Sequence, residues 1–262
     1  MEINSYNKIT NKNIDKKRFK EALNKVIGVE KELNGIGTLK EKTVHSVMKY
    51  YYEPDSDFHE VKIGSYVADI CVGKNIYEIQ TRSFNAMRGK LDYFLKEYDV
   101  TVIYPVPHIK WISWLDMDTG ELTPKRKSPK KGTIYQIIPE LYKIKMFMNN
   151  PKLHFIIPLI DVEETRYLNG WSDNKKRGSS RMDGIPIDIY DEIRINTMAD
   201  YAKFLPDDLP KEFTTKDFAK CAHIQQRYAV TGLNVLLETG IVERTGKIKN
   251  SYIYKKAPNL VY

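Results

Sequence analysis

The segment of residues 58–95 constrains the fold of this chain more than any other part of its sequence. It contains three short runs of β-branched and aromatic residues, HEVKIG, YVADICV and NIYEIQT, separated by glycine-containing turns at residues 64–65 and 73–75. This pattern predicts a meander of three antiparallel strands. Asp69 stands in the second run and Glu78 in the third, and a tight turn between paired strands brings such positions within side-chain reach.

Two acidic side chains on otherwise apolar strands need a compensating partner. A carboxylate removed from water is unfavourable by several kcal/mol unless it is paired, hydrogen-bonded or bound to a metal. Hard divalent cations such as Mg²⁺ take oxygen ligands from one or two carboxylates and retain several water molecules. The two acidic residues therefore predict a site for Mg²⁺ (or Mn²⁺). Gln80 stands two residues after Glu78 and should project from the same face of its strand.

The spacing of Asp69, Glu78 and Gln80 resembles the D…(D/E)xK signature of the PD-(D/E)xK nuclease superfamily, with Gln80 in place of the family's lysine. The resemblance implies that Asp69 and Glu78 hold the metal ion, with the Ile79 carbonyl as a further ligand. It also implies that Gln80 orients the water that attacks a phosphodiester bond. Glutamine carries no positive charge, but the helix expected next offers three cations that could replace the lysine. These are Arg82, Arg88 and Lys90.

The family's pattern often includes one more acidic residue before the core. Glu41 is one candidate, on a helix expected from Thr38 to about Tyr52. Glu60, in the first strand of the meander, is the other. Both candidates remain open at the level of sequence.

The rest of the first domain reads as alternating helices and strands. Residues 84–98 show a helical period of apolar side chains, and residues 100–104 form the continuous apolar run of an interior strand. A helix over about 134–148 and a strand over 153–162 should follow. We therefore expect an α/β fold with a mixed central sheet flanked by helices, the restriction-endonuclease-like arrangement that the resemblance implies. This domain would span residues 35–185, after an N-terminal arm and helix in residues 1–34.

The last part of the chain, residues 186–262, resembles a winged helix-turn-helix domain. We expect a first helix over 188–204, a short second helix over 216–222 and a third over 225–239. Residues 240–254 would form the hairpin called the wing. A shift in composition near Ile185 and Pro186 marks the expected boundary between the two domains.

Positive charge favours nucleic acid as the partner. The net charge is +8 and the isoelectric point is about 9.1, which suits a polyanion. We expect DNA, in duplex form, to contact two basic loops, the third helix and the wing. The residues assigned to these contacts are Lys125, Arg126, Lys127, Lys130, Lys131, Lys175, Lys176, Arg177, Gln226, Arg227, Asn234, Lys247 and Lys249.

The remaining sequence features concern the cellular setting. Cys71 and Cys221 lack the spacing of metal ligands and suit buried thiols in a reducing compartment. The N-terminus lacks the apolar core of a signal peptide, and no run is long enough to cross a membrane. We expect a cytoplasmic protein with no membrane partner, and a homodimer remains open.

Two classes of function follow from these observations. The first, which we favour, is a metal-dependent deoxyribonuclease that the winged helix brings to DNA. The second is a non-catalytic DNA-binding regulator with a degenerate nuclease fold, because Gln80 replaces the family's lysine. A third interpretation is structural: Asp69 and Glu78 would only form ion pairs with Arg82 or Lys90.

Overall fold

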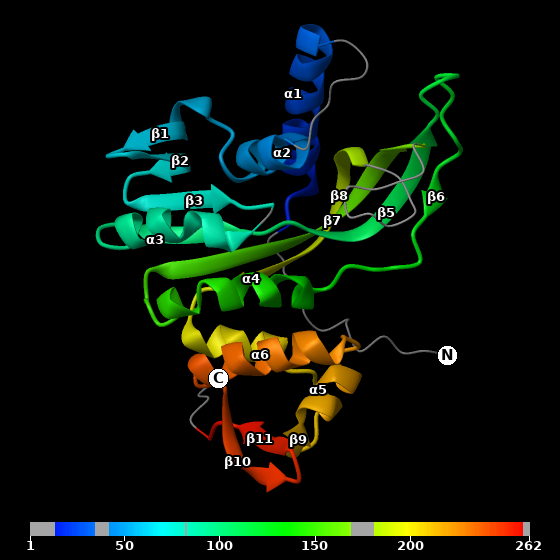
Figure 1. Ribbon diagram of the computed structural model, residues 1–262. Helices are drawn as coiled ribbons and strands as arrows, with labels where there is room; N and C mark the ends of the chain where they lie inside the picture. Colours follow the sequence, from blue (N-terminus) through cyan, green and yellow to red (C-terminus); the bar gives the residue numbers. More distant parts are fainter. Residues whose placement is uncertain (1–13, 35–41, 82, 169–180, 259–262) are drawn as a thin grey trace.

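The structure is a computed structural model that describes residues 14–34, 42–81, 83–168 and 181–258. A central sheet carries helices on both faces, and the C-terminal helices and hairpin pack beneath it (Figure 1). Helices α1 (Lys16–Asn34) and α2 (Lys42–Tyr52) cover one face, while α3 (Arg88–Phe94) and α4 (Ile138–Lys143) cover the other. The predicted α/β class, with a mixed sheet between helices, is confirmed.

The strands of the central sheet follow the predicted meander and crossover. Their bounds are β1 (His59–Ile63), β2 (Tyr66–Val72), β3 (Asn75–Ile79), β4 (Asp99–Ile103), β5 (Val106–Leu115), β6 (Arg126–Lys127), β7 (Leu153–Tyr167) and β8 (Arg181–Ile195). The order is β1-β2-β3-β4-β7-β5-β6, in which β4 and β5 pair with successive parts of the same edge of β7. Strand β8 pairs with the other edge of β7. Strands β1, β2 and β3 are antiparallel, whereas β3, β4, β7 and β5 are parallel.

The crossover from β3 to β4 packs on the sheet through apolar side chains. A short 3-10 helix, η3 (Phe84–Met87), leads into α3. Phe84, Met87, Leu91 and Phe94 are fully buried, as their helical spacing predicts. The helix expected over 134–148 is broken instead into η4 (Ile134–Ile137), α4 and η5 (Lys145–Phe147).

Strand β5 continues the line of β4 and, with its neighbours, forms a projecting arm. Strand β4 pairs with residues 153–156 of β7, and β5 pairs with residues 159–167 of the same edge. Beyond Ile156, β7 extends for roughly 36 Å at the usual rise per residue, and its neighbours among the described strands are β5 and β8. We call β5, β6, β8 and residues 157–167 of β7 the arm, which lies at the upper right in Figure 1.

The helix predicted over residues 188–204 is wrong across most of its length. Residues up to Ile195 belong to β8, which pairs with β7 from Ile195 to Arg181. Isoleucine recurs at every second position, 185, 187 and 189, which is the period of a strand. The boundary predicted at Ile185 and Pro186 therefore falls inside β8. Only residues 198–204 are helical, as η6 (Met198–Phe204).

The C-terminal segment shares the hydrophobic core of the sheet. It comprises β9 (Glu212–Thr214), α5 (Thr215–Cys221), α6 (Gln226–Glu238), β10 (Val242–Ile248) and β11 (Ser251–Lys256), with a sheet order of β10-β11-β9. Thr214 caps α5 by accepting from the Asp217 N–H. A Cβ on Gly232 of α6 would lie 3.0 Å from Ile138 of α4 and 3.2 Å from Phe218. This close contact joins α6 to α4, and both helices belong to one apolar cluster.

Candidate active site

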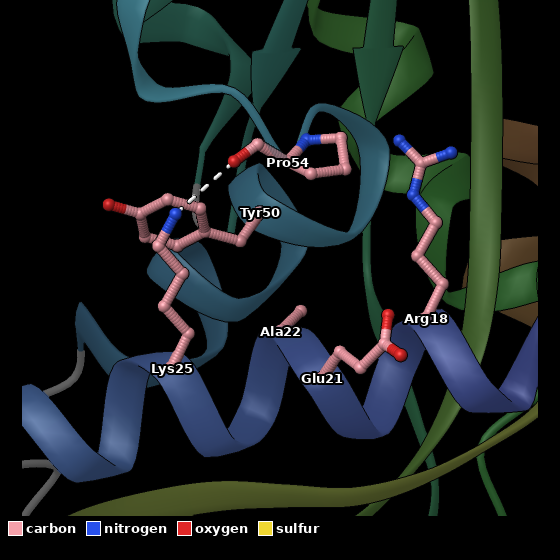
Figure 2. Close-up of a pocket in the computed structure, with 6 residues that line it drawn as sticks. All are labelled: Arg18, Glu21, Ala22, Lys25, Tyr50 and Pro54. Atoms are coloured by element: carbon pink, nitrogen blue, oxygen red, sulfur yellow. Dashed lines mark hydrogen bonds between the residues drawn. The ribbon is translucent and has the colours of Figure 1, made fainter.

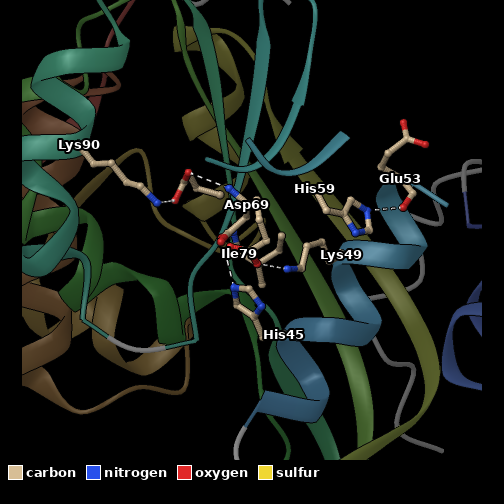
Figure 3. A network of polar contacts seen from close by, with 9 residues as sticks. His45, Lys49, Glu53, His59, Asp69, Ile79 and Lys90 are labelled. Carbon is tan, nitrogen blue, oxygen red and sulfur yellow. Dashed lines mark hydrogen bonds and ion pairs between the residues drawn. The ribbon is translucent and has the colours of Figure 1, made fainter. Parts of the chain in front are cut away.

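Asp69 and Glu78 lie side by side on neighbouring strands. The register of β2 and β3 pairs Ile70 with Tyr77, which places the two acidic residues opposite each other. The Asp69 N–H donates to Glu78 Oε1 over 3.3 Å, and the Ile79 N–H donates to Asp69 Oδ2 over 2.8 Å. The structure thus brings both carboxylates to the C-terminal end of β3, as the meander predicts. Figure 3 shows Asp69 and Ile79 there.

Two basic side chains reach this pair from opposite faces of the sheet. Lys90 Nζ of α3 lies 2.6 Å from Glu78 Oε2. His45 Nε2 of α2 lies 3.2 Å from Asp69 Oδ2, and Figure 3 shows it pointing toward that carboxylate. Of the two expected cations that the structure describes, Lys90 and Arg88, Lys90 is the one in contact with Glu78. The Arg88 guanidinium instead donates to the Lys143 carbonyl, and Arg82 lies outside the described residues.

The electrostatics of the two carboxylates differ. Burial, followed by the charge of Asp69, raises the pKa of Glu78 from 4.5 to about 7, despite the opposing effect of Lys90. Burial alone would also raise the pKa of Asp69, but the hydrogen bond and charge of His45, together with the Ile79 N–H, bring that pKa below its usual value. Glu78 is therefore the carboxylate that carries the unfavourable charge.

The other acidic candidates fall in different places. Glu60 lies opposite Asp69, because its neighbours in β1 pair with Ile70 and Ala68 of β2. Its carboxylate is mostly exposed and forms an ion pair with Lys49 of α2. Its φ of 53° is in the left-handed region, which interrupts β1 at this point. Glu41 lies outside the described residues.

Gln80 follows β3 directly, and its N–H donates to the Ile103 carbonyl over 2.8 Å. Sequence reasoning did not assign His45 and Lys49 to the site. They stand four residues apart on α2, and both project toward the sheet (Figure 3). An i, i+4 pair of basic residues on the helix before the meander is the sequence signal that would have found them.

The donor chemistry of the site suits a hard cation. Among the described residues, no group of three or more His, Cys, Asp and Glu side chains is arranged to hold a metal ion. Asp69 and Glu78 nevertheless supply two carboxylates from directly opposed residues, and the Glu78 side chain is almost fully buried. With the Ile79 carbonyl, these oxygens fit Mg²⁺ or Mn²⁺ by type.

The expected DNA contacts lie at separate ends of the molecule. Residues 125–131 flank β5 on the arm and are exposed apart from Ser128. Lys247 and Lys249 lie on the β10–β11 hairpin, at the opposite end of the molecule in Figure 1. Gln226 and Arg227 are exposed at the start of α6, and Asn234 is half-buried. Lys175, Lys176 and Arg177 lie outside the described residues.

A small cavity of about 90 Å³ lies between α1 and the end of α2 (Figure 2). Its lining residues are Arg18, Glu21, Ala22, Lys25, Tyr50 and Pro54. Lys25 donates to the Pro54 carbonyl over 3.2 Å and lies 4.0 Å from the centre of the Tyr50 ring. These contacts hold α1 against α2, and none of the lining residues belongs to the Asp69 site.

Comparisons with known proteins place the chain in a family. Residues 42–196 match the model of a family described as "Domain of unknown function (DUF8091)", and since they are more than half of the 262 residues, the chain belongs to this family. The matched region begins with α2 and ends just after β8, so it includes the whole central sheet.

The chain is also similar to an uncharacterized protein of Treponema pallidum (strain Nichols). The two are 25% identical over 225 residues, which cover 85% of this chain and 88% of the relative. No solved structure matches the chain. No helix in the described part of the chain is long and apolar enough to cross a membrane.

Proposed function

We propose that this protein is a metal-dependent nuclease that hydrolyses phosphodiester bonds in DNA. The observation that carries the proposal is the pair of Asp69 and Glu78 at the C-terminal end of β3, with Lys90 2.6 Å from Glu78. Two buried carboxylates with one lysine beside them have the composition of a PD-(D/E)xK site, although the lysine comes from α3 and not from β3.

The order of elements supports the same proposal. Helix α2, the antiparallel strands β1, β2 and β3, helix α3 and the parallel strand β4 follow one another along the chain. This is the succession that the resemblance to restriction-endonuclease-like proteins implies. The first acidic residue falls on the second strand and the second on the third, and both side chains lie where the parallel strands end, at the edge of the sheet where α/β proteins commonly bind ligands.

The chain's own residues have separable roles in this proposal. Asp69, Glu78 and the Ile79 carbonyl would hold Mg²⁺ or Mn²⁺, and the chemistry such an ion supplies is polarisation of the phosphate and activation of a water molecule. Lys90 replaces the family's lysine and neutralises charge beside the reacting phosphate. His45 fixes the Asp69 carboxylate through its hydrogen bond, and Gln80 orients the water.

The C-terminal segment is proposed to bind duplex DNA as a winged helix. Its succession of β9, α5, α6 and the β10–β11 hairpin, with β9 paired to β11, supports this assignment. The segment departs from the expectation in its first helix, which is the short η6. Gln226 and Arg227 on α6, with Lys247 and Lys249 on the hairpin, are the exposed side chains suited to base and phosphate contacts.

Cleavage of plasmid and linear DNA by the purified protein tests the proposal. We expect cleavage with Mg²⁺ or Mn²⁺ and none with a chelator, and we expect Asp69→Asn and Glu78→Gln each to slow it by about 100-fold or more. Glu97→Gln is the matched control, because Glu97 is an exposed carboxylate that pairs with Lys74 outside the site. Full activity in either site variant, with an unchanged circular dichroism spectrum, would contradict the proposal.

A non-catalytic DNA-binding protein is the second candidate. The observation that favours it is the ion pair between Lys90 and Glu78, which already occupies one carboxylate oxygen. In that case DNA binding would persist, Mn²⁺ would not stabilise the protein, and no cleavage would appear with any divalent cation.

A further inference from the structure

The basic segment of residues 125–131, which we call the basic strip, lies on the same side of β7 as the candidate site. Strand β8 occupies one edge of β7, so β4 and β5 both lie on its other edge. The far edge of β4 carries β3, and the far edge of β5 carries β6 within the basic strip. The strip therefore continues the line of β3 toward the end of the arm.

Main-chain hydrogen bonds fix how far the strip lies from the site. The Gln80 N–H donates to the Ile103 carbonyl, and the Gly132 N–H donates to the His108 carbonyl over 2.8 Å. The Ile103 and His108 carbonyls are five residues apart along the line of β4 and β5, so they are separated by at most about 16 Å. Arg126 pairs with Ile112, at most about 30 Å from Ile103. The strip thus begins close to the end of β3 and leads away from it.

Gly132 explains why the strip stays close to β5 at its near end. A Cβ at this position would lie 2.0 Å from the Pro107 carbonyl oxygen. Any residue with a side chain would therefore require the backbone to shift. The main chain is therefore held against β5 where the strip approaches the site.

The charge of the basic strip is largely uncompensated. Lys125 pairs with Glu163 of β7 over 2.6 Å. The other four cations, Arg126, Lys127, Lys130 and Lys131, are exposed and form no ion pair with any described residue. Exposed cations without ion-pair partners suit the phosphates of a nucleic acid strand.

Tryptophan side chains lie directly beside these cations. Lys127 Nζ is 5.7 Å from the centre of the Trp111 ring, and Arg126 Cζ is 5.7 Å from that of Trp114. Both rings are half-buried, and since Trp111 and Trp114 stand three residues apart on β5, they lie on opposite faces of the arm. A single strand on one face can therefore stack on the Trp111 ring beside Lys127. Aromatic rings among cations are typical of sites for single-stranded nucleic acid, because unpaired bases stack on the rings while the cations hold the backbone.

We infer that the basic strip holds a single-stranded segment of the DNA substrate that leads away from Asp69 and Glu78. This inference rests on the proposed function for its substrate, and it adds that the preferred substrate carries an unpaired extension on one side of the cleavage site. Duplex DNA would contact the cations but would leave the Trp111 ring without an unpaired base to stack on.

Binding without cleavage tests the inference. Fluorescence anisotropy with a chelator present would compare labelled blunt duplex DNA with the same duplex carrying single-stranded extensions of increasing length at either end. We expect one polarity of extension to tighten binding about tenfold, with a plateau once the extension spans the strip. In Lys130→Gln/Lys131→Gln this gain should disappear, while affinity for blunt duplex changes by less than about twofold.

Matched variants separate this role from general charge. Lys20→Gln/Lys62→Gln removes the same charge from exposed positions on α1 and β1 and should leave the gain intact. Trp111→Phe keeps an aromatic ring, so the protein should still fold and should retain part of the gain in affinity for extended DNA. This variant therefore tests stacking on the ring. An equal loss for blunt and extended DNA, an equal loss in the control variant, or no gain from any extension would each overturn the inference.

The design also separates the strip from the nuclease. Binding is measured with a chelator present and cleavage with Mg²⁺ or Mn²⁺, so the two results are obtained independently. If extended DNA is preferred but no metal ion supports cleavage, the proposed function fails while the strip remains as a binding surface. If cleavage occurs with no preference for an extension, the inference fails and the nuclease assignment stands.

Discussion

Two buried glutamates, Glu78 in the candidate site and Glu164 in the arm, have opposite electrostatic surroundings. Each side chain is almost fully buried, with 4% of Glu78 and 2% of Glu164 exposed. Glu164 accepts from Lys110 over 3.1 Å and from Arg166 over 2.6 Å. Glu78 has Lys90 on one side and the carboxylate of Asp69 on the other.

The direction of the two pKa shifts follows from this difference. Burial would raise the pKa of Glu164, but the charges and hydrogen bonds of Lys110 and Arg166 lower it below its usual value. Burial and Asp69 raise the pKa of Glu78. A buried carboxylate with two cations is electrostatically satisfied and serves the fold. A buried carboxylate beside a second one lacks positive charge, which is the condition that a bound cation or a functional role would explain.

The largest expected effect is on stability. Glu164→Gln leaves Lys110 and Arg166 without their anion, and since both cations are about one-third exposed, we expect a loss of about 2 kcal/mol in the free energy of unfolding. Glu78→Gln at pH 8 removes an unfavourable charge along with one ion pair, so the change should stay below about 1 kcal/mol. Urea unfolding of both variants measures the difference. Equal losses would remove the contrast between the two sites.

The features that the sequence could predict are those set by local patterns. The meander, the positions of Asp69 and Glu78, and the crossover helix follow from turns and apolar periods within a few residues of each other. Lys90 could be nominated but not chosen from the sequence, since its contact with Glu78 depends on how α3 packs against β3. Arg88, two residues earlier on the same turn of the chain, faces Lys143 instead.

The part of the chain from β8 onward was harder to predict for a physical reason. Strand β8 contains Pro186 and many charged residues, and it is a strand because it pairs with β7 along an edge. The isoleucines at 185, 187 and 189 have the period of a strand, a local signal that the predicted helix did not use. The packing of Gly232 against Ile138 joins segments almost a hundred residues apart, and no local pattern indicates it.

The second prediction uses pH to compare the two glutamates. Because the pKa of Glu78 is raised in the folded protein, the folded state binds a proton between pH 4.5 and about 7 that the unfolded state has released. Stability from this group therefore falls as pH rises through that range, by at most about 1.4 kcal/mol per pH unit. The group at Glu164 acts in the opposite sense, since its lowered pKa gives stability above pH 4.5 that is lost on acidification.

Unfolding measured from pH 5 to pH 8 with a chelator present checks this sign. Subtracting the Glu78→Gln curve from that of the wild type isolates Glu78, because the other titrating groups are shared. The difference should decline toward pH 7 and then level off. A difference that rises with pH would show that Lys90 outweighs burial and Asp69, and the site would then resemble the one around Glu164.

The smallest effect is expected from Gln80→Lys, which restores the residue found in the nuclease pattern. If Lys90 already supplies the positive charge beside Glu78, the added lysine should change the rate of DNA cleavage by less than about threefold, or about 0.7 kcal/mol. In a Lys90→Met background the same change should restore much of the lost rate, since a lysine after β3 can then take over the charge. Arg88→Met is the control, because Arg88 contacts Lys143 and not the site. A large gain from Gln80→Lys in the otherwise wild-type protein would show instead that the site lacks a functional lysine and that Lys90 serves only the fold.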